Sequence, residues 1–474
     1  MNAYQIDAPG LPRPGMRAEM IRQSLRHEVQ GRIAAVSGET IELQGMTAPL
    51  GSICQLNFDP KDVADRRESP AGRGPSAPGT ASSGTRAKVI GFRGVRPLLA
   101  PLENPGRIAA GDPVRLMDTS LKVRVGDSLC GRVLDAFGQP IDGKPLPEDL
   151  TLIDTERQPP ESLDRPPIDT PLETGVRAID GMLTCGHGQR LGIFAGSGVG
   201  KSTLLGMLAR NSDADRIVIG MVGERGREVR EFISRSLGEQ GLARSVVVVA
   251  TSDRVATQRV AAAWTATAIA ESFRDEGKNV LLLIDSVTRF AMAQRELGLA
   301  AGEPPTTRGY PPSVFNWLPR LVERAGRTTR GSITAFYTVL VEGDDNNEPI
   351  ADALRGLLDG HVVLSRALAE QSHYPPIDVL QSLSRLLPHL TDASTQHAVS
   401  VVRRHMAEYR KNADLISIGA YRSGTDPKID AAIALQDPIR VFLTQSSDET
   451  SPIAATRKGL QAIANHQVPT ATIP

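Results

Sequence analysis

The stretch GIFAGSGVGKSTLLGMLAR, residues 192–210, joins an apolar run to a helix-like run through a loop of small residues. Gly200, Lys201 and Ser202 match the end of the phosphate-binding consensus G-x-x-x-x-G-K-[ST], whereas Ala195 replaces its first Gly. The remaining glycines can adopt positive φ, so the loop can turn sharply and aim backbone N–H groups at phosphate oxygens. Ala195 is compatible with this turn if its own φ is negative. Because the flanking runs are correct, a chance glycine-rich turn is the weaker interpretation.

This motif predicts a site for Mg-ATP. We expect Lys201 to contact the β and γ phosphates and the hydroxyl of Ser202 to bind Mg²⁺. The predicted nucleotide-binding residues of the loop are Gly196, Ser197, Gly198, Val199, Gly200, Lys201, Ser202 and Thr203.

Apolar runs alternate with helical segments on both sides of the loop. Residues 216–223, 245–252 and 279–285 are almost continuously apolar, which is typical of parallel strands covered on both faces. Helix-like stretches separate them. We therefore predict an α/β domain with a mainly parallel sheet over residues 116–380.

Two carboxylates end such runs. Asp285 closes LLLID and is expected to bind Mg²⁺, although capping of the next turn is an alternative. Glu224 follows the run 216–222 and would face the same crevice, where it could orient or deprotonate an attacking water. Its charged neighbours, among them Arg225 and Glu228, are equally typical of a solvated charge cluster. From the residues alone, both interpretations of Glu224 stay open.

The rest of the chain has a different pattern. Short alternating runs with turn residues predict a small antiparallel β-barrel over residues 31–115, after an N-terminal helical segment at 1–30. The barrel is interrupted at 60–87, where Gly, Pro, Ser, Ala and Thr dominate, and we expect a flexible insert with no core. Helical periodicity without apolar strands predicts a helical domain over 381–474.

Bulk composition limits the function classes. The 474 residues include 54 Lys plus Arg and 54 Asp plus Glu, and this balance weighs against a nucleic-acid binder. The three cysteines are widely spaced and predict neither a disulfide framework nor a zinc site, as in a reducing cytosol. We find no signal-peptide pattern and no apolar run long enough to cross a bilayer. The protein could still lie on a membrane surface.

Several motifs in fixed order resemble the catalytic subunits of rotary ATPases, and more closely the ATPases of type III protein export. The similarity covers roughly residues 25 to 465 apart from the insert, and Ala before the loop glycines also occurs in the export ATPases. The fold that this resemblance implies is a RecA-like P-loop domain between a barrel and a helical base. The motifs are GRVLDAFGQPIDG, GSGVGKST, GERGREVREF, LLLIDSVTRFA, RGYPPSVF, HYPPIDVLQSLSR and the long segment that begins YTVLVEGDDNNEP.

The resemblance implies roles for particular residues. Glu224 matches the catalytic Glu of the family, and Arg225 and Arg289 match arginines that line the site beside Glu228. Tyr374 matches an aromatic residue that stacks on adenine, although Ser372 stands where family members often have Gly. Arg385 matches an arginine finger that reaches the nucleotide of the next subunit, so activity would require assembly.

The same resemblance implies a homohexameric ATPase that energises export of flagellar proteins, cytoplasmic and peripheral at the inner membrane. Implied partners are a central coiled-coil stalk, a stator-like regulator at the N-terminus, export gate membrane proteins and chaperone–substrate complexes. A virulence injectisome ATPase is the first alternative, and a catalytic subunit of a proton-driven ATP synthase is the second. A nucleic-acid motor ranks last, because residues 30–58 contain one aromatic, Phe58, and one cation, Arg32.

Overall fold

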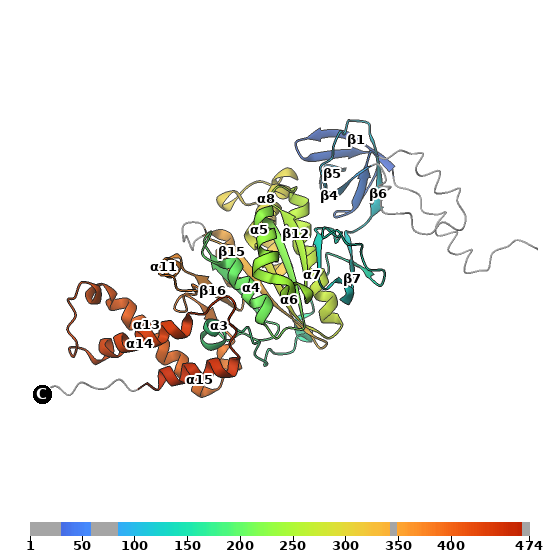
Figure 1. The fold of residues 1–474 in the computed structure, drawn as a ribbon. Helices are drawn as coiled ribbons and strands as arrows, with labels where there is room; N and C mark the ends of the chain where they lie inside the picture. Colours follow the sequence, from blue (N-terminus) through green and yellow to red (C-terminus); the bar gives the residue numbers. More distant parts are fainter. Residues whose placement is uncertain (1–29, 58–83, 342–347, 467–474) are drawn as a thin grey trace, which may run out of the picture. The chain divides into compact units, whose positions relative to one another are not determined.

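The computed structural model describes residues 30–57, 84–341 and 348–466, and the chain forms two compact units that divide between Thr119 and Ser120. Figure 1 colours both units along the sequence. Except for its last residue, Gln30, the predicted N-terminal helical segment lies outside the described residues, as does most of the predicted insert.

The first unit is a closed antiparallel barrel in the strand order β1-β2-β5-β4-β3-β6. Its core consists of inward-facing aliphatic side chains such as Ile33, Ile41 and Leu99, which are fully buried. In β2, apolar Ile41 and Leu43 alternate with polar Thr40 and Glu42, and this alternation specifies which face of the strand points into the core. The strands are β1 (Gln30–Ser37), β2 (Thr40–Gln44), β3 (Ile53–Leu56), β4 (Thr85–Arg93), β5 (Arg96–Pro101) and β6 (Pro113–Asp118).

Strand β4 corrects one sequence-based boundary. The insert was predicted to continue to residue 87, but β4 begins at Thr85 and pairs with β3 through Leu56–Thr85 and Cys54–Ala87. Ala87 is fully buried in the barrel core. Small residues are typical of a loop, and the prediction rested on them. Here they form a strand instead, because their backbone pairs with β3 and Ala87 fits a tightly packed position in the core.

The second unit contains a mainly parallel sheet in the order β17-β16-β10-β15-β13-β11-β12-β8, with β14 added antiparallel to β15. Only β14 and β17 run antiparallel to their neighbours. A separate antiparallel pair is formed by β7 (Lys122–Val125) and β9 (Thr151–Asp154). The sheet strands are β8 (Arg132–Asp135), β10 (Arg190–Ala195), β11 (Arg216–Glu224), β12 (Ser245–Thr251), β13 (Asn279–Asp285), β14 (Gly326–Arg327), β15 (Ser332–Leu340), β16 (Gly360–Leu364) and β17 (Leu383–Ser384).

Helices cover both faces of this sheet. Ile217 and Ile219 of β11 share a core with Leu204 and Leu208 of α4 (Lys201–Asn211) on one face. Gly220 points to the other face, where an added Cβ would lie 3.1 Å from Ala266 of α7 (Ala256–Asp275). The other helical elements of this region are η1 (Asp127–Leu129), η2 (Ser162–Asp164), α3 (Arg177–Met182), α5 (Gly226–Glu231), the π-helix η3 (Phe232–Leu237), α6 (Gly238–Ala243), α8 (Val287–Ala300), η4 (Thr307–Gly309), α9 (Pro312–Val322), α10 (Pro349–Leu357) and α11 (Arg366–Glu370).

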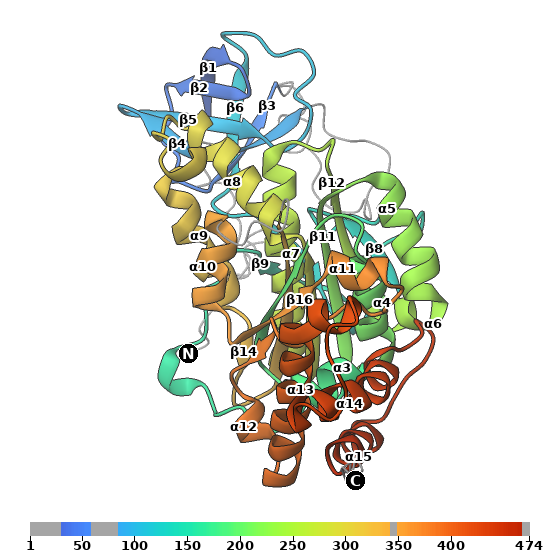
Figure 2. The same ribbon diagram turned by 90° about the vertical axis from the view of Figure 1, so that its left-hand side faces the viewer.

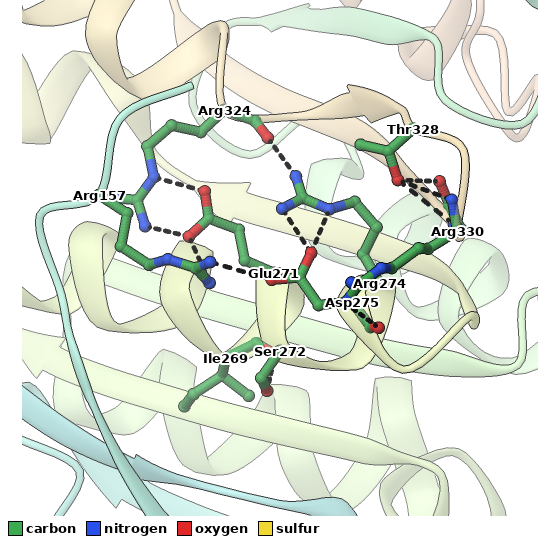
Figure 3. Close-up of polar contacts among 10 residues, drawn as sticks. Arg157, Ile269, Glu271, Ser272, Arg274, Asp275, Arg324, Thr328 and Arg330 are labelled. Carbon is green, nitrogen blue, oxygen red and sulfur yellow. Dashed lines mark hydrogen bonds and ion pairs between the residues drawn. The ribbon is translucent and has the colours of Figure 1, made fainter. Parts of the chain in front are cut away.

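A buried ion-pair network fastens α7 to the end of α9 (Figure 3). Arg324 is fully buried and donates from Nε and Nη2 to the two carboxylate oxygens of Glu271 at 2.8 and 2.6 Å. Its Nη1 donates to the Thr155 carbonyl at 2.7 Å, and the Arg324 carbonyl accepts from Arg274 at 3.1 Å. Nη1 of Arg157 lies 3.6 Å from Oε2 of Glu271, the oxygen that also accepts from Nη2 of Arg324. Two buried charges are thus paired and almost completely hydrogen-bonded.

The C-terminal helices are α12 (Leu387–Leu390), α13 (Ala393–Ser417), α14 (Pro427–Leu443) and α15 (Ile453–Ala464), and the last three contact α3 (Figure 2). Phe442 and Leu460 share one hydrophobic core with Ile179 of α3 and with the sheet. The observed barrel, parallel sheet and helical base confirm the predicted fold class. Within the described residues, no helix is both long and apolar enough to cross a membrane.

Candidate functional site

The phosphate-binding loop lies between β10 and α4, at the carboxyl end of the parallel sheet. Gly198 and Gly200 have φ of 78° and 97°, which side-chain-bearing residues rarely adopt. Ala195 is instead the buried last residue of β10, where its register partners are Leu340 and Leu364. Its φ is not positive, so replacing the consensus glycine does not distort the turn.

Lys201 joins the two carboxylates that were predicted to share its crevice. Its Nζ lies 2.5 Å from Oδ1 of Asp285 and 3.3 Å from Oε1 of Glu224. Both carboxylates are almost fully buried, and Lys201 itself is largely shielded from solvent. The arrangement brings one ammonium and two acidic groups from three different elements to a single point.

The electrostatic balance at Lys201 favours the charged ammonium. Burial alone would lower its pKa, since desolvation penalises charge. The adjacent Asp285 and Glu224 carboxylates outweigh that effect, and the pKa of Lys201 is raised above its ordinary value. Two buried carboxylates that face each other in this way require a cation between them.

A β-bulge aims Glu224 at this cluster. The register of β11 against β12 shifts between Val222 and Glu224, and Gly223 in the bulge has φ of 72°. Bulges re-aim a side chain by adding one residue to a strand. A Cβ on Gly223 would lie 2.8 Å from Cδ of Arg289, so the absence of a side chain at Gly223 leaves room for Arg289.

Of the predicted residues Arg289, Arg225 and Glu228, the structure places one in the cluster and two outside it. Arg289 lies in the cluster, with Nε 3.4 Å from Oε1 of Glu224. Arg225 is mostly exposed and pairs with Glu228 at 3.5 Å, next to the cluster in sequence but outside it in space. The site roles of Arg225 and Glu228 therefore remain predictions.

Tyr374 lies beside the phosphate-binding loop. A Cβ on Gly200 would be 3.8 Å from Cδ1 and Cε1 of the Tyr374 ring, which is 46% exposed. Ser372, two residues earlier, has φ of 58°. This left-handed conformation is one that Gly adopts more readily than Ser.

Arg385 follows the short strand β17 and has an exposed side chain. Its backbone N–H donates to the Asp359 carbonyl at 3.0 Å, and its Nη2 donates to the Arg355 carbonyl at 3.4 Å. The first bond fixes the backbone, and the second holds one end of the guanidinium, which remains exposed at the surface. Its role as a finger in trans stays a prediction.

Two contacts of the site were missed in the sequence. Thr338 of β15 donates from Oγ1 to Oδ1 of Asp285 at 2.7 Å, and Arg366 of α11 donates to the Ser197 carbonyl at 3.2 Å. A hydroxyl residue near the carboxyl end of the strand was the available signal for Thr338, although Ser332 and Thr334 of the same strand make that signal weak. Arg366 stands in a surface helix, and nothing in its local pattern marks it.

Comparison with known protein families finds two matches. The nucleotide-binding domain of the ATP synthase alpha/beta family matches residues 175–384. The C-terminal domain of the type III secretion ATPase EscN matches residues 391–462. The first match contains the loop, both carboxylates, Tyr374 and the β17 strand. The second covers the C-terminal helices from α13 to α15.

Individual relatives match nearly the whole chain. The flagellum-specific ATP synthase of Bacillus subtilis is 49% identical over 437 residues, which cover 92% of this chain and 95% of that protein. The SPI-2 type 3 secretion system ATPase of Salmonella typhimurium is 53% identical over 363 residues, or 77% and 84% of the two chains. A solved structure of the assembled ATPase EscN from enteropathogenic E. coli, in complex with its central stalk EscO, superposes with a TM-score of 0.80 at 42% identity. It covers 92% of this chain and all of that one.

Proposed function

This chain belongs to the ATP synthase alpha/beta family, and we propose that it hydrolyses Mg-ATP to energise type III export of flagellar proteins. The convergence of Lys201, Glu224 and Asp285 behind the phosphate-binding loop carries this proposal. Hydrolysis of Mg-ATP needs a cation that binds the phosphates, a carboxylate that binds the metal ion and a base that activates water, and these are the proposed roles of Lys201, Asp285 and Glu224. The flagellar names of relatives that match over nine-tenths of the chain support the export assignment.

Phosphate binding follows from the loop and its helix. Gly198 and Gly200 turn the backbone so that N–H groups at the start of α4 face an anion, where the helix dipole also favours negative charge. Lys201 leaves its two carboxylates for the β and γ phosphates when ATP enters. Glu224, freed from that ion pair, accepts a proton from the attacking water or orients it.

The residues present also fit Mg²⁺. The hydroxyl of Ser202 and the carboxylate of Asp285 are the hard oxygen donors that this ion prefers, and one or two protein ligands suffice when phosphates supply the others. Thr338 orients the Asp285 carboxylate through its 2.7 Å hydrogen bond. When bound, the ion neutralises charge on the β and γ phosphate oxygens.

Completion of the site requires a neighbouring subunit in this proposal. Arg385 is exposed on its own subunit and would reach the nucleotide of the next one, while Arg289 lies beside Glu224 in cis. A homohexamer of identical chains can complete every site in this way. The assembled state of the EscN relative supports self-association.

The proposed partners follow from the same function. A central stalk protein is supported by the EscN–EscO complex. The stator-like regulator at the N-terminus, the export gate membrane proteins and the chaperone–substrate complexes are proposed from the function alone, as is a cytoplasmic position at the inner membrane. We propose no nucleic-acid partner.

A deletion strain tests the assignment. Cells without this chain should be non-motile and should retain flagellar proteins in the cytoplasm. The wild-type chain should restore motility, whereas a Lys201→Ala chain should not. The second candidate, a virulence injectisome ATPase, rests on the 53% identity to the SPI-2 ATPase and ranks below the flagellar assignment, because that match covers less of the chain. Normal motility together with lost effector secretion would support that candidate instead.

A further inference from the structure

The backbone that carries Tyr374 is attached to the end of α14. Gln445, two residues beyond that helix, donates its backbone N–H to the Tyr374 carbonyl at 2.8 Å. The Tyr374 ring is 46% exposed beside Gly200, so packing fixes it only in part. The position of the ring over the phosphate-binding loop therefore depends on where its backbone is anchored.

Gln445 is itself held by all of its amide groups. Its side chain is buried, and Oε1 accepts from the backbone N–H of Arg177 at 2.9 Å. Nε2 donates to the carbonyls of Gly175 at 2.7 Å and Glu449 at 2.9 Å. An amide side chain offers one acceptor oxygen and two N–H donors. In Gln445 all three bond to backbone groups.

The surrounding contacts fix the same short segment. Arg177 donates from Nε to the Phe442 carbonyl at 2.8 Å and from Nη2 to the Thr444 carbonyl at 2.6 Å. His373, next to Tyr374, lies with Nδ1 3.4 Å from Oγ1 of Thr444. The end of α14, the start of α3 and the Tyr374 segment are thus joined at Gln445.

We propose that Gln445 is a positioning residue that holds Tyr374 in place for the nucleoside part of ATP. This inference rests on the proposed function. Gln445 does not touch the phosphate-binding loop in the described contacts, so its effect must pass through Tyr374. Loss of Gln445 should weaken the binding of a ligand that has a base and leave a bare polyphosphate unaffected.

The test compares ATP with inorganic tripolyphosphate on the full-length chain. Gln445→Met keeps the side-chain length and removes its three hydrogen bonds, so it should raise KM for ATP about tenfold while kcat changes less than about twofold. The inhibition constant of tripolyphosphate should not change. In a Tyr374→Ala background, the same substitution should change KM by less than about twofold, since residues that act as a unit are not additive.

Gln461→Met is the matched control. Gln461 of α15 donates to Ser394 and Thr395 of α13, and neither partner belongs to the Tyr374 anchor, so this variant should retain the wild-type KM. If Gln445→Met does not fold, as judged by its thermal transition, Gln445→Asn replaces it, since it keeps an uncharged amide and withdraws its polar groups from their partners by one methylene.

Each other outcome overturns the inference. If Gln445→Met also weakened inhibition by tripolyphosphate, Gln445 would have a general structural role. If Gln445→Met raised KM as much in the Tyr374→Ala background as in the wild type, Gln445 would not act through Tyr374. An unchanged KM in Tyr374→Ala would reject the stacking role while ATP hydrolysis stands. A wild-type chain that assembles but hydrolyses no ATP would reject the proposed function itself.

Discussion

Glu224 is the residue whose chemistry is most directly testable. Its carboxylate is almost fully buried, 3.3 Å from Lys201 and 3.4 Å from Arg289. Glu224→Gln keeps the shape but cannot accept a proton, so kcat should fall by about 10²- to 10⁴-fold. The affinity for ATP should change only a few-fold, because the phosphate contacts remain. Steady-state hydrolysis and nucleotide titration measure the two effects separately.

Glu231→Gln is the matched control for that substitution. Glu231 pairs with Arg227 on the exposed surface of α5, and neither has a place in the proposed site. The control should hydrolyse ATP at the wild-type rate. Full turnover by Glu224→Gln would remove Glu224 from its proposed role.

Ser372 supplies a stability prediction at the same scale. At φ of 58°, a β-branched side chain is strained, and Ser372→Val should lower the free energy of unfolding by about 1–2 kcal/mol. Ser372→Gly should lie within about 1 kcal/mol of the wild type, because relief of strain is offset by greater freedom of the unfolded chain. Urea denaturation measures both.

Gln371→Val separates backbone strain from the general effect of a branched residue. Gln371 has φ of −84° in the same loop, so the substitution should be nearly neutral. Equal losses of stability at residues 371 and 372 would contradict the strain argument.

At the scale of elements, the buried network between α7 and α9 makes the strongest stability prediction. Arg324→Met leaves Glu271 buried with only Arg157 at 3.6 Å, and should cost about 3–5 kcal/mol of unfolding free energy. Adding Glu271→Leu to that variant should recover part of the loss, since no unpaired charge then remains. Chemical denaturation of the three proteins tests this order.

Arg327→Met serves as the control for the network. Arg327 stands three residues later, but its ion pair is with the exposed Asp169, so its loss should cost about 1 kcal/mol or less. A double variant less stable than Arg324→Met alone would show that packing, not the uncompensated charge, dominates.

Elements with strong periodicity could be predicted from sequence. NVLLLID predicts strand β13, and it places Asp285 at the correct edge of the sheet. The bulge at Gly223 could not be predicted, because it depends on the register between β11 and β12. The anchor at Gln445 was equally invisible, since its partners Gly175 and Arg177 are some 270 residues away in the chain. Local sequence patterns thus predict secondary-structure elements and the strand ends where site residues lie. The hydrogen bonds that position those residues join distant parts of the chain and cannot be predicted from local patterns.

At the scale of the whole molecule, the proposed finger predicts complementation between inactive variants. The Glu224→Gln chain lacks the proposed base but keeps Arg385, whereas the Arg385→Ala chain keeps Glu224 but lacks the proposed finger. In mixed rings, about a quarter of the sites should pair an intact Glu224 with an intact neighbouring Arg385. Hydrolysis should therefore reappear when the two are refolded or co-expressed together, and it should rise with protein concentration as rings form.

Two controls accompany the mixing experiment. Each variant alone should stay inactive at every concentration, and a chain with both substitutions should not complement Glu224→Gln. A mixture as inactive as its components, in which rings have formed, would place Arg385 outside the catalytic machinery.

The geometry of Gly223 predicts which mutations a genetic screen should recover. It carries no reactive group, yet any side chain there meets a left-handed backbone and the 2.8 Å approach of Arg289. A random screen for loss of function should therefore recover alleles at Gly223 as often as at residues that contact substrate. Alleles of this kind should resist suppression by second-site changes, because shortening Arg289 would relieve the contact but not the left-handed backbone.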